Sequence, residues 1–259
     1  MRWKSVDLAG SYGDRITRLS VGVVNRPRRA VVLFHGVHSW AQPLPGNKYA
    51  SLGGMLAERG VLPVLVESSR SCRDRLSWGS DLMGWIKAAF GGKTFEQEFS
   101  DASAAVSAVA SAYPRLPLTL WGFSLGGLIA LLAAGGYGSS ERVPVDGLIV
   151  SGSGDQLRPE CRDALALPIL RDLPDRSFLE KAARNARPAW FRSFYGSLDA
   201  SFDQPSCRRL YEGVVCDDKK WFVVDGADHS FRTLNGSPSR LPLQIMVREL
   251  REVLLSTKN

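Results

Sequence analysis

Ser124 is the residue of this chain whose type and surroundings most clearly allow covalent chemistry. It lies at the centre of Gly122-Phe123-Ser124-Leu125-Gly126, which matches the pattern Gly-x-Ser-x-Gly. Apolar runs on both sides, 116–121 and 128–134, predict a buried strand, a sharp turn and a buried helix. Glycines at 122 and 126 suit such a turn, because side chains there would collide with neighbouring backbone. We therefore expect the Ser124 hydroxyl to face the positive N-terminal end of the helix, although a glycine-rich turn with an idle serine is the alternative.

A serine hydroxyl becomes nucleophilic at neutral pH only when a nearby base removes its proton and a third group orients that base. The chain contains three histidines: His35, His38 and His229. His229 follows an apolar run at 220–224, which predicts that it lies at the same carboxyl-terminal edge of a parallel sheet as Ser124. His229 is therefore the predicted base. The alternative is a helix-capping or surface histidine.

The elements that would position these residues alternate between strand and helix patterns. The continuous β-branched and apolar run at 29–34 predicts a strand covered on both faces, as in a parallel sheet. Further strands are predicted at 61–66, 116–121, 145–150, 189–195 and 220–224. Helices are predicted by apolar residues at helical spacing in 49–59, 95–113 and 242–255. Thr94 and Gln97 form a capping box before the second of these helices. Residues 16–23 alternate in part, which predicts an edge strand.

Two segments between these elements are less regular. Residues 68–93 contain several aromatic side chains and either wall an apolar pocket or form a short packed helix at 81–90. Residues 158–186 are predicted to be mainly helical, with Pro159, Pro168 and Pro174 as breaks. A pocket above Ser124 would depend on how both segments fold.

Composition excludes several classes of protein. The net charge is +7, but the basic residues are scattered, which argues against a nucleic-acid partner; a basic surface-binding protein remains the alternative. No apolar stretch reaches transmembrane length, and no signal peptide is evident. The four cysteines show no metal-ligand spacing and are interpreted as reduced thiols of a cytoplasmic protein. We expect no metal and no cofactor.

The order of these motifs resembles the α/β-hydrolase fold superfamily, with its serine esterases and lipases. A strand ending in His35-Gly36 precedes the Gly-x-Ser-x-Gly strand, Gly196-Ser197-Leu198-Asp199 resembles the family's Gly-x-x-Asp, and Gly226-Ala227-Asp228-His229 resembles its Gly-x-x-His. The resemblance implies an α/β protein with a mostly parallel central sheet and helices on both faces. It further implies that residues 1–259 form one such domain, with a short cap-like insert at about 158–186 and a small or absent cap.

The resemblance also implies roles for single residues. Asp199 would be the acid of the catalytic triad, and the backbone N–H groups of Val37 and Leu125 would form the oxyanion hole. His35 would organise its loop, although His35 and His38 could equally have no chemical role. Asp203 and Asp155 remain alternative acids, and Asp225 and Asp228 are interpreted as turn residues.

These residues together predict a serine hydrolase that acts on a small-molecule acyl substrate. The expected reaction is cleavage of a carboxylic ester through an acyl-enzyme intermediate, with Ser124, His229 and Asp199 as the triad. The same fold could instead cleave a thioester, a peptide or a carbon–carbon bond, or serve as a non-catalytic binding protein.

Overall fold

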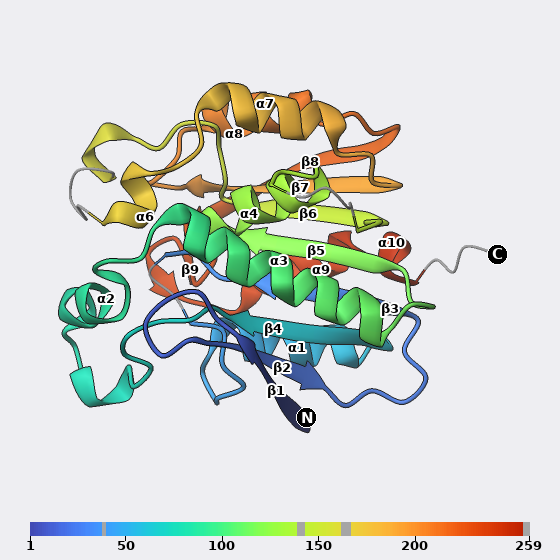
Figure 1. Cartoon of the computed structure of the whole chain (residues 1–259). Coiled ribbons are helices and arrows are strands. Elements are labelled where there is room, and N and C mark those ends of the chain that lie inside the picture. The colour runs from blue at the N-terminus through green and yellow to red at the C-terminus, as the bar shows by residue number, and fades with distance from the viewer. Residues whose placement is uncertain (38–39, 139–142, 162–166, 256–259) are drawn as a thin grey trace.

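A computed structural model describes residues 1–37, 40–138, 143–161 and 167–255, so His38 lies outside the described residues. Within these ranges the chain builds one sheet of ten strands around which the helices are arranged (Figure 1). The strand order is β1-β2-β4-β3-β5-β6-β7-β8-β9-β10.

The six central strands pair in parallel, as the run at 29–34 predicts. They are β3 (Arg29–Phe34), β4 (Val61–Glu67), β5 (Leu118–Phe123), β6 (Gly147–Ser151), β7 (Trp190–Leu198) and β8 (Asp218–Asp228). Because parallel strands end at one edge, the residues that follow β3, β5, β7 and β8 meet there. This edge carries Gly36, Ser124, Asp199 and His229.

Antiparallel strands occupy both margins of the sheet. At one margin β1 (Trp3–Ala9) pairs with β2 (Ile16–Gly22), and β2 pairs with β4. The predicted strand at 16–23 is confirmed as β2, but its expected position at the edge was wrong, because β1 lies outside it. At the other margin lie the short strands β9 (Thr233–Leu234) and β10 (Ser237–Pro238), which no sequence pattern predicted.

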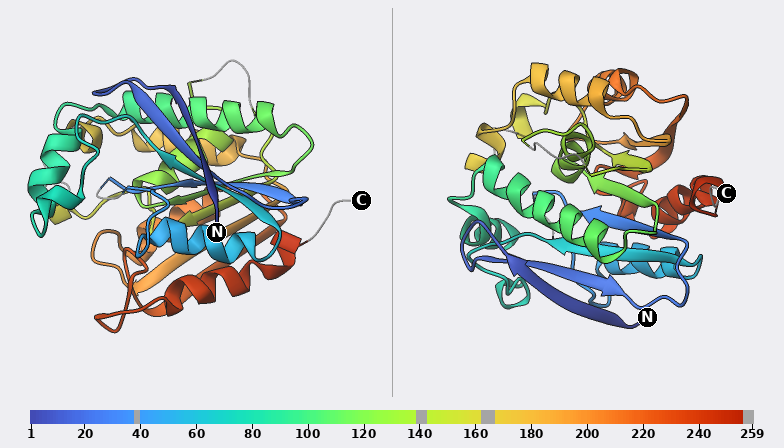
Figure 2. Two further views of the ribbon diagram at one scale, coloured as in Figure 1. Left: turned by 90° about the horizontal axis from the view of Figure 1, so that it is seen from below. Right: turned by 45° about the vertical axis from the view of Figure 1, so that its right-hand side comes forward.

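Helices cover both faces of the sheet, as expected (Figure 2). One face packs against α3 (Phe95–Ala112), α4 (Leu125–Ala134) and α7 (Arg176–Asn185), and the other against α1 (Lys48–Ala57), α9 (Leu241–Glu249) and α10 (Arg251–Leu255). Alternate residues of β3 show the division: Val32 belongs to the first core cluster, and Val31 and Leu33 to the second. The capping box of Thr94 and Gln97 opens α3 as predicted.

The two irregular segments contribute helices of different kinds. Residues 68–93 form a short 3₁₀ turn (Leu76–Trp78) and α2 (Leu82–Phe90), in which Trp85 and Phe90 are fully buried. Within 158–186, α6 (Pro168–Arg171) is short, whereas α7 packs against α4 and α8 (Gln204–Gly213). The second half of the proposed insert thus covers the sheet.

Candidate active site

Ser124 sits in a strained turn between β5 and α4. Its backbone angles are φ 55° and ψ −123°, a conformation that non-glycine residues rarely adopt. The flanking glycines are required as predicted, because a Cβ on Gly126 would lie 2.6 Å from the carbonyl oxygens of Phe34 and His35, and one on Gly122 would overlap the Gly126 carbonyl. The Ser124 N–H donates to the Ser151 carbonyl at 2.9 Å, which ties the turn to the end of β6.

Asp199 and His229 are joined by a hydrogen bond at the ends of β7 and β8. Nδ1 of His229 lies 2.9 Å from Oδ2 of Asp199, whose other oxygen accepts from the N–H groups of Ser201 and Phe202 at 2.8 and 3.0 Å. The Asp199 side chain is fully buried, so these donors replace its hydration. With the Nδ1 proton donated to Asp199, Nε2 of His229 is left as the free acceptor.

A cavity of about 490 Å³ contains both Ser124 and His229 in its lining. The hydrogen bonds of the described residues include none between these two side chains. Such contacts are often long before substrate binds. Most of the remaining wall is apolar and comes from α2, α4 and the segment around α6, through Leu82, Met83, Leu125, Leu128, Leu157 and Leu170.

The two alternative acids have other partners. Asp155 forms ion pairs with Arg209 at 2.8 Å and with Arg176 at 3.3 Å. Asp203 is the N-cap of α8, where its carboxylate accepts from the Ser206 N–H at 2.7 Å. Among the three candidate carboxylates, only Asp199 is hydrogen-bonded to His229 in the part of the chain that the structure describes.

The two expected oxyanion donors lie beside Ser124. Val37 and Leu125, the first residue of α4, both line the cavity, and the backbone N–H of neither donates to another described residue. The loop after β3 passes so close that a Cβ on Gly36 would be 3.1 Å from the Ser124 Cβ. A glycine is needed here for close approach.

His35 is placed to hold this loop. The fully buried Arg70 contacts it, with Nη2 of Arg70 donating to Nε2 of His35 at 3.0 Å. The ring proton is therefore on Nδ1, which lies 2.9 Å from the Gly36 carbonyl. Burial, and next the charge of Arg70, lower the pKa of His35 to about 4. A neutral ring with both nitrogens occupied fits the loop-organising role and not that of a base.

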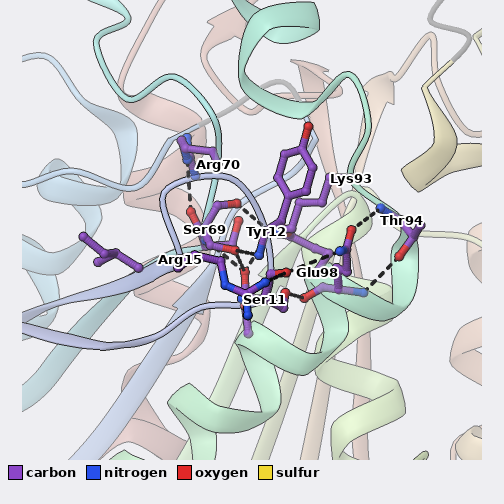
Figure 3. A network of polar contacts seen from close by, with 12 residues as sticks. Ser11, Tyr12, Arg15, Ser69, Arg70, Lys93, Thr94 and Glu98 are labelled. Atoms are coloured by element: carbon purple, nitrogen blue, oxygen red, sulfur yellow. Dashed lines mark hydrogen bonds and ion pairs between the residues drawn. The ribbon is translucent and has the colours of Figure 1, made fainter.

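Arg70 belongs to a buried polar network that Figure 3 shows in part. Nζ of Lys93, also fully buried, lies 2.6 Å from Glu98 and 2.8 Å from Asp101, and donates to the Ser69 carbonyl at 2.7 Å. Asp101 in turn accepts from the N–H groups of Ser11 and Ser69, both at 2.8 Å. The network thus joins the β1–β2 turn, the end of β4 and the start of α3 behind the His35 loop.

Sequence reasoning missed several residues at the site. Gly152 lies so close to His229 that a Cβ there would be 3.2 Å from Nδ1 of the ring, and Oγ of Ser153 donates to the Ser124 carbonyl at 2.8 Å. The sequence Ser-Gly-Ser-Gly at the end of β6, the strand next to β5, could have indicated that these residues lie beside Ser124. Lys48 lines the cavity with 6% of its surface exposed, and no signal marks it, because a lysine at the start of a helix is normally solvated.

The residues within the described ranges also bear on metal sites, membrane-spanning helices and disulfides. There, no group of three or more His, Cys, Asp or Glu side chains could hold a metal ion. No helix among those residues is long and apolar enough to cross a membrane. The four cysteines are free thiols.

Comparisons with known proteins agree with this architecture. Residues 88–186 match the family described as "Serine aminopeptidase, S33". None of the curated protein sequences matches the chain significantly. A soluble variant of monoglyceride lipase from Saccharomyces cerevisiae, solved with a substrate analog, is similar in structure, with 16% identity and a TM-score of 0.70 over 98% of this chain and 94% of that one.

Two further solved structures are similar over nearly their whole length. The esterase domain of a Rhodothermus marinus protein has 18% identity and a TM-score of 0.62, covering 97% of this chain and 99% of that one. The monoacylglycerol lipase of Paleococcus ferrophilus has 17% identity and a TM-score of 0.61, covering 93% and 99%. Strand order, the turn at Ser124 and these likenesses together identify the chain as an α/β-hydrolase fold protein.

Proposed function

We propose that the protein is a serine hydrolase that cleaves carboxylic esters through an acyl-enzyme intermediate. The observation that carries the proposal is the strained turn of Ser124, in one cavity with a histidine that is hydrogen-bonded to a buried aspartate. A serine held at φ 55° without a chemical reason would be a cost to stability with no compensation. The similar structures described as lipases and esterases support the same reading.

The proposed mechanism has two half-reactions, acylation and deacylation, that use the same residues. Nε2 of His229 takes the Ser124 proton as Oγ attacks the ester carbonyl, and Asp199 stabilises the imidazolium that forms. The amides of Val37 and Leu125 bind the oxyanion. His229 then protonates the leaving alcohol, and in the second half-reaction it activates the water that releases the acid.

We also propose that residues 1–259 act as one domain. One sheet extends from β1 to β10, and each of its two faces carries a core built from distant parts of the chain. A boundary between two domains would have to divide this sheet. The part of 158–186 nearest Ser124 is then a small cap, because Cys161 and Leu170 line the cavity whereas α7 packs against α4.

The experiment that tests the proposed function is hydrolysis of activated short-chain esters by the purified protein. Ser124→Ala should lower kcat by at least about 10⁴-fold, the scale of loss for a triad nucleophile. Ser107→Ala is the matched control, because Ser107 is exposed on α3 away from the cavity, and it should keep full activity. Equal turnover by the Ser124 and Ser107 variants would remove the assignment of the nucleophile.

A peptidase is the second candidate, favoured by the description of the matching family. The same triad would then attack an amide at a free peptide N-terminus, which needs a carboxylate to bind the terminal ammonium. Glu160 is the carboxylate that lines the cavity among the described residues, and it is exposed. Cleavage of aminoacyl arylamides faster than of matched esters would favour this alternative.

A further inference from the structure

Lys48 is a buried cation on the cavity wall beside the proposed catalytic residues. Only 6% of its surface is exposed, and its Nζ donates to the carbonyl oxygen of Ser230, next to His229, at 2.9 Å. Nζ also lies 3.9 Å from the centre of the Phe123 ring. These contacts hold the ammonium in place, but a carbonyl dipole and a ring face supply no negative charge to balance it.

Arg232 adds a second positive charge near Lys48. Within the described ranges, neither side chain has a carboxylate oxygen within 4.0 Å. The nearby Asp228 is engaged elsewhere, since its oxygens accept from the Ser230 hydroxyl and from the N–H groups of Arg232 and Thr233. Burial, and next the charge of Arg232, lower the pKa of Lys48 well below its usual value, and the negative charge of Asp228 offsets only part of this lowering. The pair therefore forms a patch of positive charge that an anion would stabilise.

Both residues stand where the cavity meets a second hollow. Lys48 and Arg232 line the cavity of about 490 Å³ and also an adjoining hollow of about 750 Å³, which Arg240 lines as well. The first cavity, but not the second hollow, is lined by Leu82, Met83, Leu125, Leu128, Leu157 and Leu170. The exposed Glu160 is the acidic member of the first lining, and it lies on that apolar side with Leu157 and Cys161. Apolar and basic groups thus come from different elements, with Ser124 in the lining they share.

We propose that Lys48 and Arg232 form a subsite for an anionic group, a phosphate or a carboxylate, on the alcohol portion of the ester. The acyl chain would occupy the apolar part of the cavity, and the anion would lie toward the second hollow. This inference rests on the proposed ester hydrolysis and adds the class of substrate. A charge-assisted hydrogen bond to the anion would replace the missing carboxylate partner of both cations.

The test compares three esters with the same decanoyl chain, on glycerol, on glycerol 3-phosphate and on glycerate. We expect kcat/KM to be at least about tenfold higher for one or both anionic esters than for the glycerol ester, the scale of one charge-assisted hydrogen bond. The two anionic esters distinguish phosphate from carboxylate. Arg232→Gln and Lys48→Met should each reduce this ratio of kcat/KM values toward one. Arg248→Gln is the matched control, since Arg248 is 72% exposed on α9, and it should leave the ratio unchanged.

Binding to the Ser124→Ala protein separates the two proposals. Calorimetry should show at least about tenfold tighter binding of an anionic ester than of the glycerol ester, with the preference lost on adding Arg232→Gln. Because Arg232 is exposed, this variant keeps the test valid if Lys48→Met fails to fold. Equal kcat/KM for all three esters, or a preference that survives Arg232→Gln, would overturn the subsite. Absence of any ester hydrolysis, with the binding preference intact, would overturn the proposed function alone.

Discussion

The two walls of the cavity are built on different principles. The polar wall comprises the His35–Val37 loop and the groups behind it, in which His35, Arg70, Lys93 and Asp101 are each at least 97% buried. The apolar wall comprises Leu82, Met83, Leu157 and Leu170, on segments that connect the sheet elements, and Leu82 and Met83 are 37% and 41% exposed.

This difference separates the requirements of chemistry from those of binding. An oxyanion hole works only when its donors are fixed before the charge develops, and buried hydrogen-bonded groups fix them. A surface that contacts an acyl chain needs only apolar area and can tolerate motion. We therefore expect changes in the polar wall to lower kcat and changes in the apolar wall to alter KM with chain length.

The largest effect is expected from Asp199→Asn, which belongs to neither wall but is hydrogen-bonded to His229. The amide would disturb the tautomer of His229, and kcat should fall by about 10⁴-fold with KM little changed. Ester hydrolysis measures this directly. Asp155→Asn and Asp203→Asn serve as controls, because their carboxylates bind arginines and the α8 N-terminus. A loss of similar size in either control would reassign the acid.

Arg70→Met should remove the hydrogen bond that holds His35 in the polar wall. Without the guanidinium, Nε2 of His35 loses its donor and the loop that carries Val37 can shift, so kcat should fall by up to about 10²-fold. The affinity of a boronic acid that mimics the tetrahedral intermediate should fall in parallel, while the KM for the ester stays nearly constant. A change in KM alone would show that Arg70 serves binding and not the oxyanion hole.

The pH dependence of stability tests the same contact without catalysis. The folded-state pKa of His35 is about 4, below its value of about 6.5 when unfolded, so the unfolded chain binds more protons between these values. The stabilisation by neutral His35 is complete above pH 6.5 and is lost as the pH falls toward 4. Between pH 7 and pH 5 the free energy of unfolding should drop by about 2 kcal/mol from this group.

The control for this prediction is His35→Gln, whose amide oxygen can still accept from Arg70. Urea unfolding at both pH values should show about 2 kcal/mol less loss in the variant than in the wild type. Other titrating groups cancel in this difference. If the free energy of unfolding changed equally with pH in both proteins, the His35 ring would be protonated in the folded state.

The smallest effect is expected on the apolar wall. Met83→Ala removes part of an exposed surface, so kcat/KM for a decanoyl ester should fall by up to about tenfold, with acetyl esters unaffected. Met55→Ala provides a matched methionine on α1, which is absent from the cavity lining. An equal loss for acetyl and decanoyl esters would contradict the separation between the two walls.

Much of the scaffold could be predicted because local patterns determine it. The strand before Ser124, the glycines at 122 and 126 and the capping box at Thr94 each follow from sequence neighbours, and the structure confirms them. The likeness to the α/β-hydrolase fold followed from the order of these motifs and is confirmed too. Catalytic roles for Ser124, Asp199 and His229 stay proposals.

The rest could not be predicted because it depends on contacts between distant segments. Lys93 and Asp101 are charged residues of types that usually stay exposed, yet tertiary packing buries both. Residues 16–23 show the pattern of an edge strand, although β1 pairs beside them. The burial of the Lys48 side chain depends on how the turn after β8 packs against α1, and no local sequence pattern predicts that contact.

Labelling by a fluorophosphonate tests the central claim, that Ser124 is an activated nucleophile served by His229. We predict that mass spectrometry of the labelled protein places the phosphonyl group on Ser124, and that His229→Ala slows its attachment by at least about 10²-fold. Labelling at a different residue, or undiminished labelling of Ser124 in the His229→Ala protein, would contradict the account.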